Sequence, residues 1–324
     1  MKELDYNKIN ANKVRNETMF RGCYHRDNNC SGKTSKAHSI QRGKILKSIS
    51  DNGEVLCIDF GDFELESDKF LKRMSIKKAS TFTGFCNYHD RNIFSPIENY
   101  DYNLDSAEQN FIFAYRACAL AYYERMSSFG MIKEDLWRHL LADCLDAELY
   151  LKAYTYNKHI EVLESYKVKI NGYLDNKQYD KIKTNVLVWD KEYGITATSM
   201  FYILKDLEGN MVNSIKSSVE DLAPFFFTLF PQNGKTYVLM SYFENDKDKY
   251  NFIEKQLIGA NEHIQKTAVT HILALYIENY FISPIWWDKI DKEVRDEYLH
   301  VQIEYMGGDK CSLQYYENLN IFVN

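Results

Sequence analysis

Two close pairs of metal-ligating side chains lie early in this 324-residue chain. Cys23 and Cys30 flank a short polar segment, and Cys86 and His89 are separated by two residues. Two such pairs joined by a longer insert are typical of a chain that wraps a tetrahedral Zn²⁺, because each pair supplies two of the four ligands. The sequence therefore predicts a structural zinc site, with His25 as an alternative ligand to Cys23.

The segment between the two pairs resembles part of a known enzyme family. A cysteine pair, then a short strand ending in His38 followed by Ser39-Ile40, resembles the HNH (ββα-metal) endonuclease family. The resemblance implies that His38 is the general base. It also implies that the second pair opens a helix, and that Asp90, just past the last zinc ligand, binds a catalytic Mg²⁺ or Mn²⁺.

This chain departs from the family pattern at two positions. The residue before the base is often acidic or a histidine that supplies a second metal ligand, and here it is Ala37. The asparagine that orients the base has no clear counterpart, and Ser80 or Thr81 is the nearest polar substitute. His38 therefore has two alternative roles, as a buried core residue or as a zinc ligand.

The charge of the chain is unevenly distributed. The net charge is −6, yet residues 1–50 hold 11 Lys/Arg against 4 Asp/Glu. A basic N-terminal region on an acidic chain favours a local contact with nucleic acid, although a solvated charged arm has the same composition. The contact residues we expect to grip the nucleic-acid backbone are Lys33, Lys36, Arg42 and Lys44.

The start of the chain is charged and lacks the apolar segment of a secretory signal. No apolar run is long enough to span a membrane. We therefore expect a cytoplasmic protein with reduced thiols and no membrane partner.

A helical hairpin is predicted after the metal-binding region. Apolar residues recur at helical spacing from Asp105, a possible N-cap, to Phe129-Gly130, which we expect to end the helix. A second helix is expected from about Lys133 to Lys169, with Leu136, Leu140, Cys144, Tyr150 and Leu151 on its apolar face. Such a hairpin offers a surface for homo-oligomerisation.

The pattern changes near Thr184 from helical to alternating periodicity. The expected strands cover 186–189, 195–204, 224–230 and 236–243, and the expected helices cover 247–257, 262–281 and 291–298. Because the strands follow one another without intervening helices, the sheet should be antiparallel. The predicted fold class is α+β, with a zinc-bound ββα-like module (1–102), the helical hairpin (103–175) and a C-terminal α+β domain (176–324).

Two functions remain open from the sequence. The first is a zinc-stabilised, metal-dependent HNH-like nuclease, with bacterial defence or toxicity as its setting by association. The second is a non-catalytic zinc module that binds nucleic acid or a protein partner, while the C-terminal domain acts as a sensor. Ala37 favours the second, whereas His38 and Asp90 favour the first.

Overall fold

A computed structural model describes residues 13–14, 16–58, 70–142, 146–214, 221–306 and 318–323. The chain divides into two compact units, of which the first comprises Met1–Ala37, Phe82–Ile93 and Cys118–Asn176. The second comprises His38–Thr81, Phe94–Ala117 and Lys177–Asn324. Within the described ranges, no helix has the length and apolar character needed to cross a membrane.

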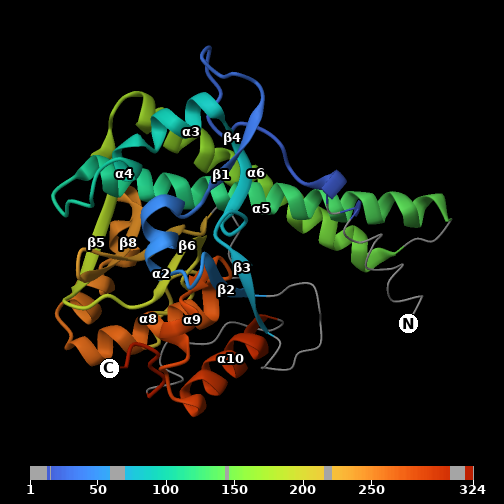
Figure 1. Cartoon of the computed structure of the whole chain (residues 1–324). Helices are drawn as coiled ribbons and strands as arrows, with labels where there is room; N and C mark the ends of the chain where they lie inside the picture. The colour runs from blue at the N-terminus through green and yellow to red at the C-terminus, as the bar shows by residue number, and fades with distance from the viewer. Residues whose placement is uncertain are drawn as a thin grey trace. The chain divides into compact units, whose positions relative to one another are not determined.

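The second unit is built on a seven-stranded sheet (Figure 1) with the strand order β3-β2-β9-β6-β7-β8-β5. Its strands are β2 (Glu54–Ile58), β3 (Leu71–Ser75), β5 (Ile182–Trp189), β6 (Ile195–Phe201), β7 (Phe225–Gln232), β8 (Lys235–Phe243) and β9 (Tyr280–Ile282). Every pairing in this sheet is antiparallel. The structure thereby confirms the α+β class with an antiparallel sheet.

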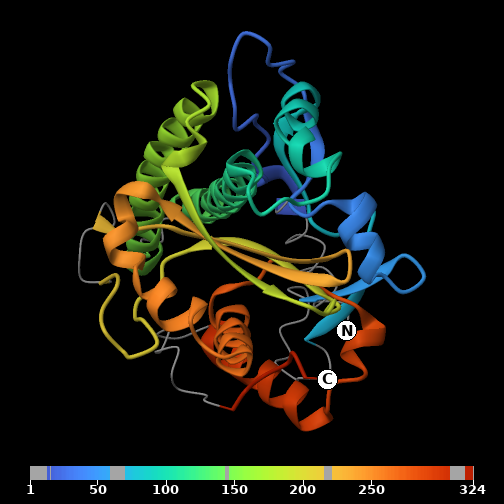
Figure 2. The same cartoon turned by 90° about the vertical axis from the view of Figure 1, so that its left-hand side faces the viewer.

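Both faces of this sheet are covered by apolar side chains. Successive strand residues point to opposite faces, so Phe227 of β7 packs in the core with Val269 and Leu273 of α8 (Glu262–Tyr276). Figure 2 shows α8 beneath the sheet. On the other face, Phe230 stacks on Phe113, with ring centroids 5.1 Å apart. The double coverage explains why the strands read as nearly continuous apolar runs.

The insert between the two predicted ligand pairs contributes β2 and β3 to this sheet. The two strands pair with each other from Glu54↔Ser75 to Ile58↔Leu71. Leu56 of β2 also pairs with Ile282 of β9, and Ile282 in turn pairs with Ile195 of β6. The three-residue strand β9 therefore joins an N-terminal strand pair to the C-terminal strands.

The remaining elements of the second unit are short helices and the first turns of α5. They are η1 (Arg42–Leu46), α2 (Lys47–Ile49), α4 (Ser95–Glu98), η3 (Tyr179–Lys181), η5 (Glu244–Asp246), α7 (Lys247–Tyr250), η6 (Ile253–Ile258), α9 (Pro284–Trp287) and α10 (Lys292–Met306). The predicted helix 262–281 is too long, because α8 ends at Tyr276 and β9 begins at Tyr280. The intervening Asn279 bonds to Thr198 of β6 through both backbone and side chain, which draws the chain into the sheet.

The first unit contains a two-stranded sheet, a short helix and the helical hairpin. These are β1 (Thr34–His38) and β4 (Thr81–Cys86) without the end residues His38 and Thr81, α3 (Asn87–Ile93), the greater part of α5 (Ala107–Leu141) and α6 (Ala147–Asp175). Tyr122 of α5 bonds to Glu164 of α6, and Arg125 stacks on Tyr156 earlier in α6. Tyr122 comes before Arg125 in α5, whereas its partner Glu164 comes after Tyr156 in α6. The two helices therefore run antiparallel, as predicted.

The predicted break at Phe129-Gly130 is wrong. Helix α5 passes through Gly130 to Leu141, and α6 begins only at Ala147, where Asp146 accepts a hydrogen bond from the Leu149 backbone (3.0 Å). A glycine inside a helix costs about 1 kcal/mol relative to alanine, so it does not by itself end one. A Cβ at Gly130 would lie 2.6 Å from the carbonyl oxygen of Thr18, so glycine serves close packing here.

The start of α5 and one apolar face also differ from expectation. Ser106, and not Asp105, caps the helix, because its hydroxyl accepts a hydrogen bond from the Gln109 backbone (3.2 Å). Leu140, Tyr150 and Leu151, predicted to share a buried stripe, are between 49 and 63% exposed. The predicted Cys144 lies outside the described residues.

Candidate metal centre and histidine site

The four predicted zinc ligands come together in the first unit. The ligand atoms of Cys23, Cys30, Cys86 and His89 all lie within 4.8 Å of one another. Nδ1 of His89 is 3.2 Å from Sγ of Cys23 and 3.4 Å from Sγ of Cys86. In a tetrahedral zinc site a cysteine sulfur and a histidine nitrogen are roughly 3.6 Å apart, so this donor set fits Zn²⁺ in both chemistry and size.

Backbone hydrogen bonds hold the first ligand pair against the second. The Tyr24 N–H donates to the Gly84 carbonyl of β4 (2.7 Å), and the Cys86 N–H points at Sγ of Cys23 (3.4 Å). Cys86 ends β4, and His89 lies in the first turn of α3, which turns its ring back toward the sulfurs. All three residues Cys23, Cys86 and His89 are buried, whereas Cys30 is partly exposed.

A carboxylate lies beside the histidine of this cluster. While Nδ1 of His89 faces the sulfurs, its other ring nitrogen lies 3.0 Å from a carboxylate oxygen of Asp27, close enough for an ion pair although not aligned as a hydrogen bond. Zinc-binding histidines commonly place such a carboxylate on the second nitrogen, which fixes the tautomer and raises the basicity of the ligand. Asp27 is a residue that the sequence analysis missed.

The two buried sulfurs differ in how readily they ionise. Burial raises the pKa of Cys23 to about 12, and the adjacent sulfur of Cys86 adds to the rise. Burial also opposes ionisation of Cys86, but hydrogen bonds from Ser31, from the His89 backbone and from Cys23 outweigh it and lower the pKa to about 6. Metal binding would release the remaining thiol protons, since only thiolates ligate zinc.

His25, the alternative ligand, points to a different partner. Its Nε2 lies 2.9 Å from a carboxylate oxygen of Asp175 at the end of α6, and its ring is buried. The His25 ring lies 4.7 Å from that of His89 between centroids. The set of four that includes Cys23 is therefore complete without His25, which lines the cluster.

His38, at the end of β1, has a defined tautomer. Its Nδ1 lies 3.1 Å from the carbonyl oxygen of Ala79 and 3.2 Å from the hydroxyl of Ser80. A carbonyl oxygen can only accept, so Nδ1 carries the proton and Nε2 of the neutral ring is left as a proton acceptor. The side chain is half-buried, and burial lowers its pKa below the ordinary 6.5, against the opposing effect of the Ala79 carbonyl.

Of Ser80 and Thr81, the two polar residues weighed as substitutes for the family's asparagine, Ser80 is the one whose hydroxyl contacts His38 (3.2 Å). Its hydroxyl donates to the Ile40 carbonyl (3.2 Å), which leaves an oxygen lone pair facing His38. Ser80 has a φ of 58°, in the left-handed region that non-glycine residues rarely adopt. The other candidate, Thr81, instead donates to the Lys78 carbonyl (2.8 Å).

Three charged residues of the second unit act on His38. The positive charges of Arg42 and Arg116 lower its pKa, whereas Glu98 raises it. Arg116 is only 3% exposed in its side chain and lies 2.6 Å from Glu98. The sequence analysis missed this pair. The available signal was an arginine at position 116 inside the apolar helical stretch that surrounds it.

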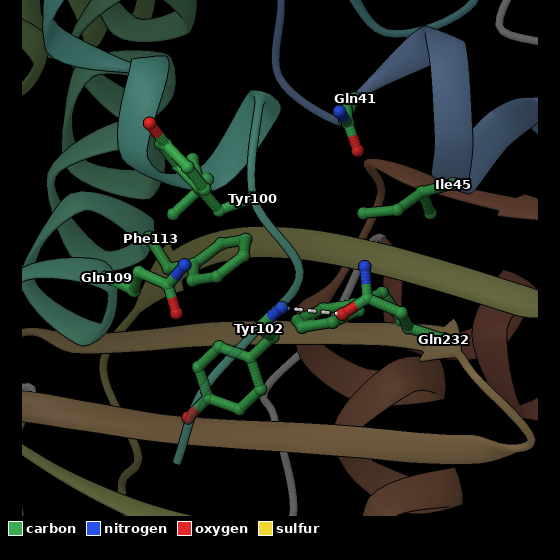
Figure 3. A pocket seen from close by; sticks show the side chains of 9 residues that line it. Gln41, Ile45, Tyr100, Tyr102, Gln109, Phe113 and Gln232 are labelled. Atoms are coloured by element: carbon green, nitrogen blue, oxygen red, sulfur yellow. Dashed lines mark hydrogen bonds between the residues drawn. The ribbon is translucent and has the colours of Figure 1, made fainter. Parts of the chain in front are cut away.

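Figure 3 shows the side chains of Gln41, Gln109 and Gln232 around the loop that follows Glu98. Three glutamine side chains line a small pocket of about 10 Å³, room for roughly one water molecule. Gln41 donates to the backbone carbonyl of Glu98, and Gln232 accepts from the Tyr102 N–H (2.7 Å). Gln109 donates to two further carbonyls of the same loop. These amides position the loop, and the pocket is too small for a substrate.

The remaining predicted site residues are placed as follows. Lys33, Lys36 and Arg42 are exposed, as a nucleic-acid contact requires. Lys44 is also exposed, and its ammonium group lies 2.9 Å from a carboxylate oxygen of Asp101.

The predicted metal-binding carboxylate belongs to the first unit. Asp90 follows His89 in α3 and is half-buried. His38 belongs to the second unit, so the common cleft expected for the two side chains stays a prediction.

Comparison with family models, with curated proteins and with solved structures found no match to this chain.

Proposed function

We propose that this protein is a zinc-stabilised, metal-dependent nuclease of the HNH-like kind. The proposal is supported by the order of the elements: a ligand pair, β1 ending in His38, β4 ending in Cys86, and α3 with the last ligand. Two strands and a helix around one zinc ion are what the ββα-metal resemblance implies. The zinc would hold the two ligand pairs together and take no part in the chemistry.

The observation that carries the proposal is the hydrogen bond between His38 and the Ala79 carbonyl. It fixes the tautomer in which Nε2 accepts a proton, and burial lowers the pKa of His38, which favours the neutral ring. A general base must be deprotonated and oriented before the reaction begins. Its two acceptors, the Ala79 carbonyl and the Ser80 hydroxyl, orient the His38 ring, and its lowered pKa favours the neutral form.

In the proposed reaction, Nε2 of His38 takes a proton from water. The resulting hydroxide attacks the phosphorus of a phosphodiester, and the bond from phosphorus to the leaving oxygen breaks. Asp90 would hold Mg²⁺ or Mn²⁺, which supplies charge neutralisation at the scissile phosphate. Lys33, Lys36 and Arg42 would contact neighbouring phosphates of the nucleic acid.

The test is cleavage of labelled DNA and RNA in the presence of Mg²⁺ or Mn²⁺. We expect His38→Ala to abolish cleavage while the zinc content and circular dichroism stay unchanged. His300→Ala is the matched control, because His300 is a histidine of the same unit with a 78% exposed side chain. Asp90→Ala should raise the metal concentration required for half-maximal cleavage.

Equal cleavage by the wild type and His38→Ala, or none by either, would favour the second function, a non-catalytic zinc module. One observation already favours that function. Ala37, which stands where the family often has a metal ligand, is fully buried and offers no donor atom. In that case the exposed basic residues would bind nucleic acid or an acidic partner without cutting it.

A further inference from the structure

Arg116 is a buried cation with incomplete partners. Its guanidinium lies over the Phe94 ring, 4.1 Å from the centroid, and one terminal nitrogen lies 2.6 Å from a carboxylate oxygen of Glu98. Its Nε is buried and has no hydrogen-bond partner among the residues that the structure describes. A buried donor left unpaired costs about 1–3 kcal/mol, so the sequence retains this arginine at a cost in stability.

Asp206, another buried charged residue of the same unit, has more hydrogen-bond partners than Arg116. The carboxylate of Asp206 is buried and accepts four hydrogen bonds, from the backbones of Glu208 and Asn210 and from the side chains of Asn210 and Gln256. That network is saturated, as a charge kept only for folding should be. Among the residues that the structure describes, Arg116 forms an ion pair with Glu98 alone, and the side chain of Glu98 is 41% exposed.

The exposure of Glu98 marks the direction from which a ligand can approach. Its side chain is 41% exposed, whereas the side chain of Arg116, 2.6 Å away, is 3% exposed. A carboxylate and a phosphate present their oxygens to a guanidinium in the same forked geometry. Glu98 can therefore rotate into solvent and leave its place to a phosphate group.

We propose that Arg116 and Glu98 form a phosphate-binding site beside His38, in which the Glu98 carboxylate holds the place of a phosphate. The side chain of Gln41, three residues after His38, donates a hydrogen bond to the backbone carbonyl of Glu98, which ties the segment that carries His38 to the segment that carries Glu98. The charges of Arg116 and of the exposed Arg42 also act on His38. The inference rests on the proposed nuclease function for its substrate, the phosphodiester of a nucleic acid. Arg116 would then hold the phosphate, and His38 would deprotonate the water that attacks this phosphate.

The test is a titration of the intact protein with inorganic phosphate and with dimethyl phosphate, followed by the NMR signal of the His38 ring. We expect saturable binding that raises the pKa of His38, because an anion beside the ring favours its charged form. Arg116→Gln should lose saturable binding. Glu98→Gln should bind phosphate about two- to fivefold more tightly, since the half-exposed ion pair no longer competes.

The matched control is Glu134→Gln. Glu134 also pairs with an arginine on α5, Arg138, at 3.3 Å, and its side chain is 44% exposed. The substitution makes the same change in net charge, but Arg138 is exposed. We expect no change in phosphate binding near His38. If Arg116→Gln does not fold, as judged by circular dichroism, Arg116→Lys replaces it and should bind phosphate more weakly than the wild type.

Two outcomes overturn the inference. The first is a Glu98→Gln protein that binds phosphate no more tightly than the wild type, which would make Glu98 a structural partner. The second is unchanged binding in the folded Arg116 variant. Neither readout uses cleavage, so phosphate binding with no nuclease activity would refute the proposed function and leave this site standing.

Discussion

Nδ1 of His38 lies 3.1 Å from the carbonyl oxygen of Ala79. This bond leaves Nε2 as the only position on the ring that can accept a proton. The partner is a backbone atom, which side-chain substitution cannot remove. The orientation of His38 therefore depends on the path of the chain through Ala79 and Ser80.

The first prediction concerns pH. Burial lowers the pKa of His38 below 6.5, the charges of Arg42 and Arg116 lower it further, and the Ala79 carbonyl and Glu98 oppose this. The neutral base exists above the folded pKa, so cleavage should rise with pH below 6.5 and reach a plateau by neutral pH. The initial rate measured against pH, beside the NMR titration of His38, checks this. A rise centred above 6.5 would point to a different base.

The second prediction concerns Ser80. Ser80→Ala removes the bond to Ile40 but keeps a side chain at positive φ, and should lose about 1 kcal/mol in the free energy of unfolding. Ser80→Gly removes the same bond but relieves the left-handed backbone, so it should lose less. Urea unfolding of both variants measures the difference. A glycine variant less stable than the alanine variant would contradict the assigned strain.

The third prediction concerns metal content. Purified protein should contain about one zinc ion per chain, and a chelator should lower its melting temperature, because metal binding stabilises only the folded state. Cys86→Ala should lose the zinc. Cys118→Ala, which alters a buried cysteine of the same unit outside the cluster, should keep it. Elemental analysis decides, and a folded, zinc-free wild type would refute the metal centre.

The fourth prediction concerns Asp27. Its carboxylate lies 3.0 Å from the ring nitrogen of His89 that faces away from the sulfurs. Asp27→Asn should weaken zinc binding about 10- to 100-fold, as loss of such partners does elsewhere. Competition with a zinc-sensitive dye measures the affinity. Asp175→Asn is the control, since Asp175 contacts His25, and an equal loss in both variants would remove the special role of Asp27.

The sequence predicted local features well where one strong pattern decided them. The dipeptide Asn233-Gly234 lies between the expected strands 224–230 and 236–243, and both residues have positive φ, as the two-residue hairpin turn requires. The spacing of Cys86 and His89 likewise predicted a pair of ligands, and the family resemblance implied that this pair opens a helix, as α3 does. These signals lie within a few residues of each other, so no distant partner can override them.

The features that sequence missed depend on distant partners. Gly130 was predicted to end a helix, but the structure shows that glycine is needed there for close packing against Thr18. The ion pair of Arg116 with Glu98 depends on contacts that no spacing rule reveals. The pairing of β2 with β9 joins strands that lie far apart in the sequence, and no periodicity in either strand indicates which strand it pairs with.

That last pairing has a consequence for synthesis in the cell. Ile282 is made 226 residues after its partner Leu56. At about 5–20 residues per second, the ribosome needs roughly 10–45 s to supply it. During that interval β2 can pair with β3, but its other edge stays open to other chains. We therefore expect nascent chains of this protein to need a chaperone until translation passes β9.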